Sequence, residues 1–226
     1  MPTVLITGAS RGIGLEFVRQ YAAAGWKVLA CCRKPGTATD LNKITGDVTL
    51  FALNVDDDAN IASLATQLKS MPIDVLINNA GISRPEATTL GQVSSEVWLQ
   101  VFRTNTIAPL KMAEAFLPNL EAGKEKKLIA ITSRLGSIEL NEGGRYSYRS
   151  SKAALNSAWK SLAGDTAGKG MICVVFHPGW VQTDMGGKAA PVTPPQSVAG
   201  MVKLIGGFTR KDNGTFRNFD GETLPW

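Results

Sequence analysis

The 226-residue sequence predicts a single-domain α/β fold, in which a doubly wound parallel sheet of about seven strands carries helices on both faces. Three observations predict it. Short apolar runs alternate with helical patterns along almost the whole chain. The runs are apolar at successive positions, as strands covered on both faces require. No internal repeat, low-complexity tract or linker divides the chain, so residues 1–226 are expected to form one domain.

Each predicted strand is a short β-branched or apolar run, and the seven span residues 3–7, 27–32, 48–53, 75–78, 128–132, 173–177 and 215–219. The helical patterns between them span residues 13–24, 57–70, 94–120, 146–167 and 195–208. Parallel strands require right-handed crossovers, which these helices supply. Within 94–120, Asn105 and Pro109 interrupt the amphipathic pattern and predict a kink or bulge.

The first strand leads into a glycine-rich turn and a helix. Gly8, Gly12 and Gly14 have the spacing G-x3-G-x-G, with Ser10, Arg11 and Ile13 between them. Unpaired N–H groups and the positive end of the helix dipole face one point there, which favours an anion. Glycines allow a pyrophosphate to approach the backbone. The turn therefore predicts a Rossmann-type dinucleotide site, and an ordinary glycine-rich βα turn is the alternative.

The end of the second strand indicates which dinucleotide binds. An acidic residue there would bind the ribose 2′-hydroxyl and repel a 2′-phosphate. Arg33 follows this strand instead, and Asp40 lies too far along the chain. With Arg11 from the glycine turn, Arg33 is expected to hold a 2′-phosphate, which favours NADP(H) over NAD(H). The alternative is that both arginines only face solvent.

Further polar residues follow the third and fourth strands. Asn54 and Val55 come after the third, and Asn78, Ala80 and Gly81 belong to the Asn-Asn-Ala-Gly sequence that ends the fourth. Such positions line the ligand crevice of an open parallel sheet. Asn105, in the long helix, fits a buried structural role as well as a site role.

Tyr148 and Lys152 are four residues apart on a predicted helix and therefore share one face. A phenol has a pKa near 10, and a neighbouring ammonium favours its ionised form. A decrease of about 3 pKa units needs on the order of 4 kcal/mol and more than one positive group. Tyr21 and Tyr146 have no lysine at this spacing, so Tyr148 is the candidate acid–base residue.

Composition excludes several classes of function. The net charge is +5, but lysines and arginines are scattered, so nucleic acid binding is not expected. One histidine and three cysteines offer no metal-ligand spacing. Cys31, Cys32 and Cys173 lie in apolar runs and are expected to be buried free thiols. No apolar run reaches transmembrane length and no signal peptide is apparent, so a cytoplasmic location is expected.

Taken together, these motifs resemble the short-chain dehydrogenase/reductase family, and the match runs from Thr3 to about Thr183. The opening Val-Leu-Ile-Thr-Gly-Ala-Ser-Arg-Gly-Ile-Gly-Leu and the closing Phe-Asp-Gly-Glu-Thr-Leu-Pro-Trp are most similar to the short members around C-factor and sniffer-type carbonyl reductases. The matching motifs are residues 7–14, residues 78–81, Asn105, Ser133, Tyr148-x-x-x-Lys152 and Pro178-Gly179.

The resemblance implies a role for each matching residue. Tyr148 would exchange a proton with the substrate oxygen, and Lys152 would lower the pKa of Tyr148 and bind the nicotinamide ribose. Ser133 would hold the substrate oxygen, with Ser137 as a nearby competitor, and Asn105 would fix a water linking Lys152 to solvent. Asn54, Val55, Asn78, Ala80 and Gly81 would line the adenosine half of the cofactor. Residues 178–183 would close over the nicotinamide, contributing Pro178, Gly179, Val181 and Thr183.

The function implied is NADP(H)-dependent interconversion of a carbonyl compound and its alcohol. The alternative is a dinucleotide-binding signalling or regulatory protein of C-factor type with little turnover. A small-molecule substrate is expected, walled by residues 82–90, which include Glu86, and by residues 136–145 and 185–192. Relatives form dimers or tetramers, and monomers occur in this subgroup.

Overall fold

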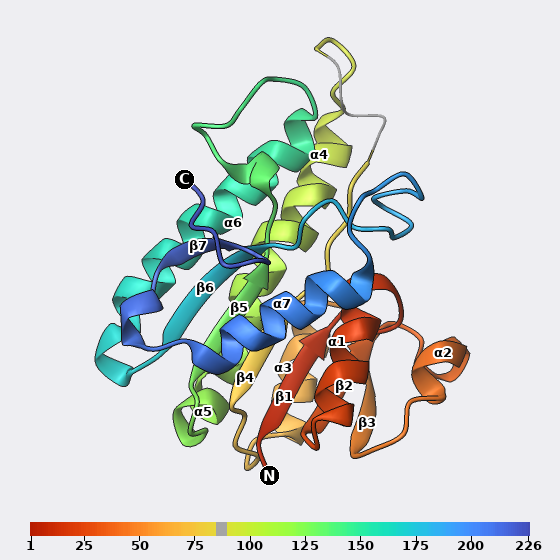
Figure 1. Cartoon of the computed structure of the whole chain (residues 1–226), viewed down its shortest axis with the longest axis vertical. Coiled ribbons are helices and arrows are strands. Elements are labelled where there is room, and N and C mark those ends of the chain that lie inside the picture. The colour runs from red at the N-terminus through yellow and green to blue at the C-terminus, as the bar shows by residue number, and fades with distance from the viewer. Residues whose placement is uncertain (85–89) are drawn as a thin grey trace.

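A computed structural model of the chain describes residues 1–84 and 90–226. Its core is one seven-stranded sheet in the order β3-β2-β1-β4-β5-β6-β7, and every neighbouring pair is parallel (Figure 1). The chain starts at the centre with β1, winds outward to β3 and then returns to build the other half. This confirms the doubly wound sheet that the alternating pattern predicted.

The strands lie where the apolar runs placed them, within a residue or so at their ends: β1 Thr3–Thr7, β2 Lys27–Cys32, β3 Val48–Ala52, β4 Val75–Asn78, β5 Lys127–Ile131, β6 Ile172–His177 and β7 Thr215–Asn218. The central strands β1, β4 and β5 are buried along their whole length. Their continuous hydrophobicity is therefore explained by cover on both faces.

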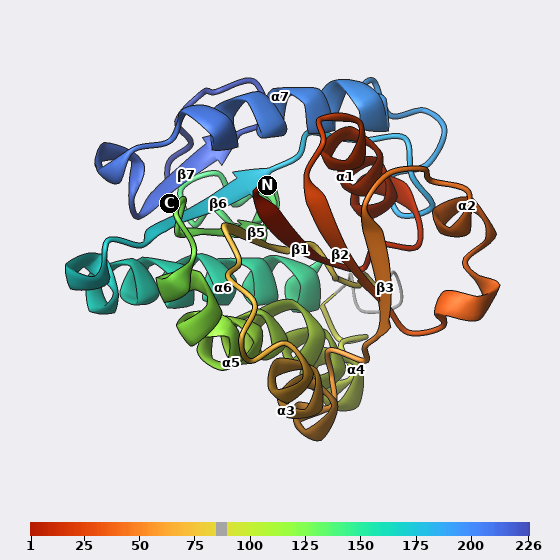
Figure 2. The same cartoon turned by 90° about the horizontal axis from the view of Figure 1, so that it is seen from below.

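Helices cover the sheet on both faces. The helices are α1 Gly12–Ala23, α2 Thr39–Asn42, α3 Asp58–Gln67, α4 Ser95–Phe102, α5 Ala108–Ala122, α6 Tyr146–Asp165 and α7 Pro194–Gly207. Figure 2 shows α1 and α7 on one face and α3, α5 and α6 on the other. Each face has its own buried apolar cluster, one packed around Phe17 and Phe176 and the other around Phe116 and Trp159.

The helical stretch expected over residues 94–120 carries a local irregularity. A π-helical turn at Arg103–Ile107 joins α4 to α5. This is the irregularity that Asn105 and Pro109 predicted. The short helix α2 was not predicted at all, because four residues are too few for a periodic pattern to show.

The cysteine prediction holds: Cys31, Cys32 and Cys173 are free and buried. In the part of the chain that the structure describes, no helix combines the length and apolarity needed to cross a bilayer.

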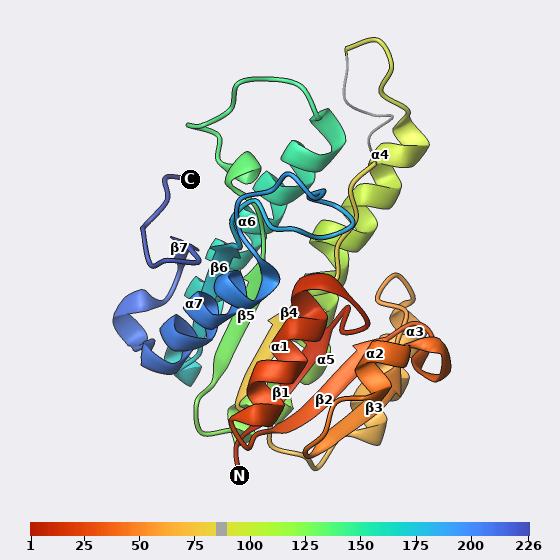
Figure 3. The same ribbon diagram turned by 45° about the vertical axis from the view of Figure 1, so that its right-hand side comes forward.

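The irregular segment between β6 and α7 reaches the glycine turn from the far half of the sheet. Figure 3 shows this segment, in blue, above the start of α1. A Cβ built on Gly12 would lie 3.3 Å from the Cγ2 atom of Thr183. The fold thus brings residues some 170 positions apart in sequence to two sides of one opening.

Candidate functional site

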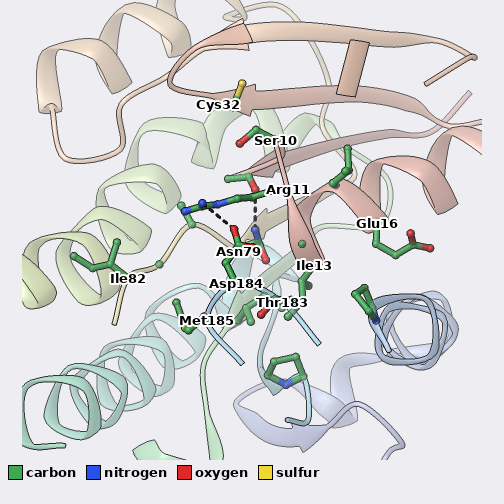
Figure 4. A pocket seen from close by; sticks show the side chains of 18 of the residues that line it. Ser10, Arg11, Ile13, Glu16, Cys32, Asn79, Ile82, Thr183, Asp184 and Met185 are labelled. Carbon is green, nitrogen blue, oxygen red and sulfur yellow. Dashed lines mark hydrogen bonds and ion pairs between the residues drawn. The ribbon is translucent and has the colours of Figure 1, made fainter. Parts of the chain in front are cut away.

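A cavity of about 1080 Å³ runs along the carboxyl ends of the parallel strands. Its walls come from the glycine turn, the ends of β2 to β5, one face of α6 and the segment between β6 and α7 (Figure 4). This is the edge at which open parallel sheets bind ligands. The volume lies at the upper end of the range for small-molecule sites, roughly 300–1,000 Å³.

Two glycines of the turn are required by close backbone approach. Gly8 has φ +67, and a Cβ there would lie 2.9 Å from the Cα atom of Ala80. A Cβ on Gly14 would lie 2.2 Å from the Gly8 carbonyl oxygen. The turn therefore folds tightly on the end of β4 and leaves the first N–H groups of α1 facing the cavity.

Asn79 holds the turn against β4 and was missed as an individual residue. Its Nδ2 donates to the carbonyls of Thr7 and Gly8, at 3.0 and 3.2 Å. The neighbouring Asn78 is buried, and its Nδ2 donates to the Pro109 carbonyl at 3.4 Å. Of the two asparagines in the predicted Asn-Asn-Ala-Gly sequence, Asn79 thus lies on the cavity wall and Asn78 beneath it.

The β2 end of the cavity is positively charged. Cys32 and Arg33 both line it, and Arg33 is exposed. Asp40, the first acid after β2, lies on α2 and pairs with Lys43 at 3.1 Å. No described carboxylate forms an ion pair with Arg33.

Arg11 is placed differently from the expectation that it would join Arg33. Its Nη1 pairs with Asp184 Oδ2 at 3.0 Å, across the opening between the glycine turn and the 178–193 segment (Figure 4). Both side chains are more than 70% exposed, at 73% and 76%. Because an exposed pair contributes only about 0–1 kcal/mol, a bound anion can displace Asp184 from Arg11 at little cost.

Tyr148 and Lys152 lie one turn apart on α6 at the inner end of the cavity. Lys152 Nζ is 5.9 Å from the centre of the Tyr148 ring and donates to the Ile131 carbonyl at 2.8 Å. Burial lowers the pKa of Lys152 to about 8. Burial also raises the pKa of Tyr148, whereas hydrogen bonding by Ser133 and the charge of Arg145 lower it.

Ser133, two residues beyond β5, is the serine whose side chain reaches the Tyr148 phenol. Its Oγ also accepts from the Leu135 N–H at 3.1 Å, which fixes the turn that follows. The competitor Ser137 is buried, and its Oγ accepts from the Leu140 N–H at 3.2 Å. Between the two serines, the geometry favours Ser133 as the partner of Tyr148.

Asn105 occupies the middle of the π-helical turn and is fully buried. Its side chain bonds to both backbone groups of Ile82, and Nδ2 also donates to Ser151 Oγ at 3.1 Å. Gly81 packs against both Asn105 and Lys152. A Cβ on Gly81 would lie 3.3 Å from Asn105 Oδ1 and 3.6 Å from Lys152 Nζ. The long helix, β4 and α6 therefore meet at one point.

Most of the predicted cofactor residues line the cavity. They are Gly8, Ser10, Arg11, Gly12, Ile13, Arg33, Asn54, Val55, Ala80, Gly81, Tyr148, Lys152, Pro178 and Thr183. Gly14, Asn78, Gly179 and Val181 are not among the lining residues. Gly14 and Asn78 pack the wall from behind. Gly179 packs close to Phe219, and Val181 is buried.

Sequence reasoning missed several lining residues, chiefly Glu16, Cys32, Asn79, Gln182 and Asp184. Each lies within a few residues of a predicted one, but no pattern indicated which neighbour faces inward. Of the expected substrate walls, Ile82, Met185, Gly187 and Lys188 reach the cavity, and the 136–145 wall does not. Residues 85–89, including Glu86, lie outside the described residues.

Comparison with known proteins gives one consistent result. The family model described as short chain dehydrogenase matches residues 2–192. The C-signal protein of Myxococcus xanthus is 42% identical over 165 residues, which cover 73% of this chain and 99% of that protein.

Two solved structures resemble the whole chain. The NADPH-bound carbonyl reductase from chicken fatty liver has a TM-score of 0.91 at 38% identity, covering 100% of this chain and 99% of that one. The carbonyl reductase Sniffer of D. melanogaster has a TM-score of 0.91 at 35% identity, covering 100% of both chains.

Proposed function

Because the chain belongs to the short-chain dehydrogenase family, we propose that it is an NADP(H)-dependent carbonyl reductase, which interconverts a carbonyl compound and its alcohol. The observation that carries this proposal is the pair Tyr148 and Lys152 at the inner end of a cavity that begins at a glycine turn, with Ser133 hydrogen-bonded to Tyr148. A site that only binds a dinucleotide needs no acid–base residue there.

The cavity residues fit a phosphorylated dinucleotide. The glycine turn and the start of α1 would hold the pyrophosphate, and Asn54, Val55, Ala80 and Gly81 would line the adenosine half. Arg33 would bind the 2′-phosphate, since no acidic residue ends β2. Similarity to the NADPH-bound chicken enzyme supports the same choice. When bound, the reduced cofactor supplies the hydride that the carbonyl carbon receives.

Tyr148 would supply the proton. In reduction the carbonyl oxygen gains negative charge, and the phenol O–H breaks as its proton passes to that oxygen. Ser133 would donate a hydrogen bond to the same oxygen and stabilise the developing charge. In the opposite direction the phenolate takes the alcohol proton.

Lys152 and Asn105 would support Tyr148. The Lys152 ammonium favours the phenolate left after proton transfer. In this cavity its Nζ donates to the Ile131 carbonyl, and we assign to it a second bond, to the nicotinamide ribose. The Asn105 side chain is already bonded to Ile82 and Ser151. We therefore propose that the main chain of the π-helical turn, rather than this side chain, holds the water that links Lys152 to solvent.

A second function is favoured by the 42% identity to the protein named C-signal. In that case the chain would bind the dinucleotide as a signalling or regulatory protein with little turnover. A cytoplasmic location and the state of assembly stay predictions.

The test is oxidation of NADPH with a panel of aldehydes, ketones and quinones. We expect Tyr148→Phe to lose roughly 10²–10⁴-fold in kcat, the contribution of a positioned acid, while keeping its affinity for NADPH. Tyr146→Phe, on the same helix two residues earlier, is the matched control and should stay active. Turnover that is no higher than that of Tyr148→Phe on every substrate would favour the signalling protein.

A further inference from the structure

Arg145 lies against Tyr148 in a strained backbone conformation. It precedes α6 with φ 49 and ψ 42, a left-handed conformation that residues with side chains rarely adopt. Its Cζ atom is 5.3 Å from the centre of the Tyr148 ring, and its Nη2 donates to Ser83 Oγ at 3.3 Å. Such strain persists only where surrounding contacts hold it, and it concentrates at functional sites.

Among the described residues, two cations approach the Tyr148 ring. Arg145 approaches the ring from the start of α6, and Lys152 lies 5.9 Å from the ring centre, one turn along the same helix. The segment after β5 contributes the neutral Ser133. The segment between β6 and α7 contributes Lys188 and Asp184 to the same cavity, and Asp184 pairs with Arg11. No described carboxylate forms an ion pair with Arg145. Within residues 1–84 and 90–226, its charge is therefore not neutralised by an ion-pair partner.

Arg145 and Lys152 differ in how long they keep their charge as the pH rises. Burial lowers the pKa of Lys152 to about 8, so its ammonium is lost progressively above neutrality. A guanidinium stays protonated throughout this range. One lysine is also too little to ionise the half-buried Tyr148 phenol, whose own pKa is raised by desolvation.

Resting on the proposed function, we propose that Arg145 is the second cation of the acid–base site. It lies over the Tyr148 ring so that, together with Lys152, it stabilises the phenolate and makes the phenol a stronger acid toward the substrate oxygen. Because Arg145 is exposed, its effect is attenuated by water, and we expect it to change the Tyr148 midpoint by about half a pH unit to one unit.

The first test follows the ionisation of Tyr148 directly, through the near-ultraviolet absorbance of tyrosinate in the cofactor-free protein. Subtracting the titration of Tyr148→Phe isolates this residue from Tyr21 and Tyr146. Arg145→Gln should raise the midpoint by about half a unit to one unit, and Arg145→Lys should restore most of it. Arg84→Gln removes a nearby cation that does not contact the ring, and should leave the midpoint unchanged.

The second test is the pH profile of kcat/KM for alcohol oxidation, which uses only folded, active protein. Arg145→Gln should move the ascending limb to higher pH by the same amount as the absorbance midpoint. An unchanged limb and midpoint in an active variant would overturn the proposal. So would a rise in KM confined to anionic substrates without a shift, since Arg145 would then be a substrate anchor.

The two proposals can fail separately. A shifted Tyr148 midpoint in a protein without turnover on the substrate panel would support the role of Arg145 and refute the reductase. Turnover that depends on Tyr148, with an unshifted midpoint in Arg145→Gln, would do the reverse.

Discussion

The side chain of Asn105 bonds to both backbone groups of Ile82: its Oδ1 accepts from the N–H at 2.8 Å, and its Nδ2 donates to the carbonyl at 2.9 Å. Ile82 lies beyond the end of β4. The Asn105 amide therefore makes the two hydrogen bonds that a neighbouring strand would make to its N–H and C=O. It fixes the segment after β4 against the π-helical turn, next to Gly81 and Lys152.

Replacing Asn105 by alanine should impair both stability and catalysis. The change leaves the partly buried N–H and C=O of Ile82 unpaired, which costs about 2–4 kcal/mol in the free energy of unfolding. We also expect kcat to fall at least about tenfold, because the wall beside Lys152 loosens. Asn119→Ala is the matched control, since that buried amide donates to Leu68 and Met71 at 2.7 and 2.9 Å, away from the cavity. It should lower Tm comparably without lowering kcat, and equal losses of kcat in the two variants would contradict a specific role for Asn105.

Replacing Arg33 by glutamine should weaken NADPH binding selectively. A charge-assisted hydrogen bond to a phosphate is worth about 1.5–3 kcal/mol, which corresponds to a roughly 10–100-fold rise in Kd for NADPH and little change for NADH. Titration of nucleotide fluorescence measures both constants. Lys34→Gln removes the neighbouring charge, which is exposed and does not line the cavity, and should change neither. Equal weakening of NADPH and NADH by Arg33→Gln would exclude a 2′-phosphate contact.

Replacing Gly14 by alanine should disrupt the glycine turn. The new Cβ would lie 2.2 Å from the Gly8 carbonyl oxygen. The backbone of residue 14 fixes the Cβ and the oxygen is itself a backbone atom, so neither can move without opening the turn. We expect loss of NADPH binding together with a lower Tm. Gly164→Ala, inside α6 and exposed, has no atom within 4 Å of the new Cβ. It should stabilise the protein by about 0.5–1 kcal/mol through helix propensity. A Gly14→Ala variant that binds NADPH normally would refute the proposal that the glycine turn holds the pyrophosphate.

The buried ammonium of Lys152 should make stability depend on pH. Its pKa is lowered by burial from the ordinary 10.5 to about 8 in the folded protein, so the unfolded state binds more protons between these limits. Below this window the buried ammonium of Lys152 lowers the free energy of unfolding by a constant amount. Across the window the free energy of unfolding should rise with pH, by about 3 kcal/mol in total. The measurement is urea unfolding of two proteins, Tyr148→Phe alone and Tyr148→Phe with Lys152→Met, so that the phenol does not titrate in either. The quantity compared is the difference between their free energies of unfolding at each pH. A difference that stays constant from pH 7 to 10 would contradict it.

Local patterns in the sequence were enough to predict the sheet. The seven apolar runs became the seven strands because a strand buried on both faces must be apolar throughout, a property that does not depend on its neighbours. The break at Asn105 and Pro109 was also visible, because a polar residue and a proline conflict with the helical period. Helix α2 was invisible because four residues carry no period.

For the site, the sequence by itself determined the residue types at the strand ends: the glycine turn, Arg33, and the pair Tyr148 and Lys152 at one helical turn. These follow from spacing along single elements, which sequence records directly. Only the tertiary structure decided which side chains meet across elements. It paired Arg11 with Asp184, placed Asn78 behind the wall and Asn79 on it, and brought Ser133 and Arg145 to the Tyr148 phenol. The reason is that contacts between distant segments depend on packing geometry and on competing partners, which no local pattern encodes.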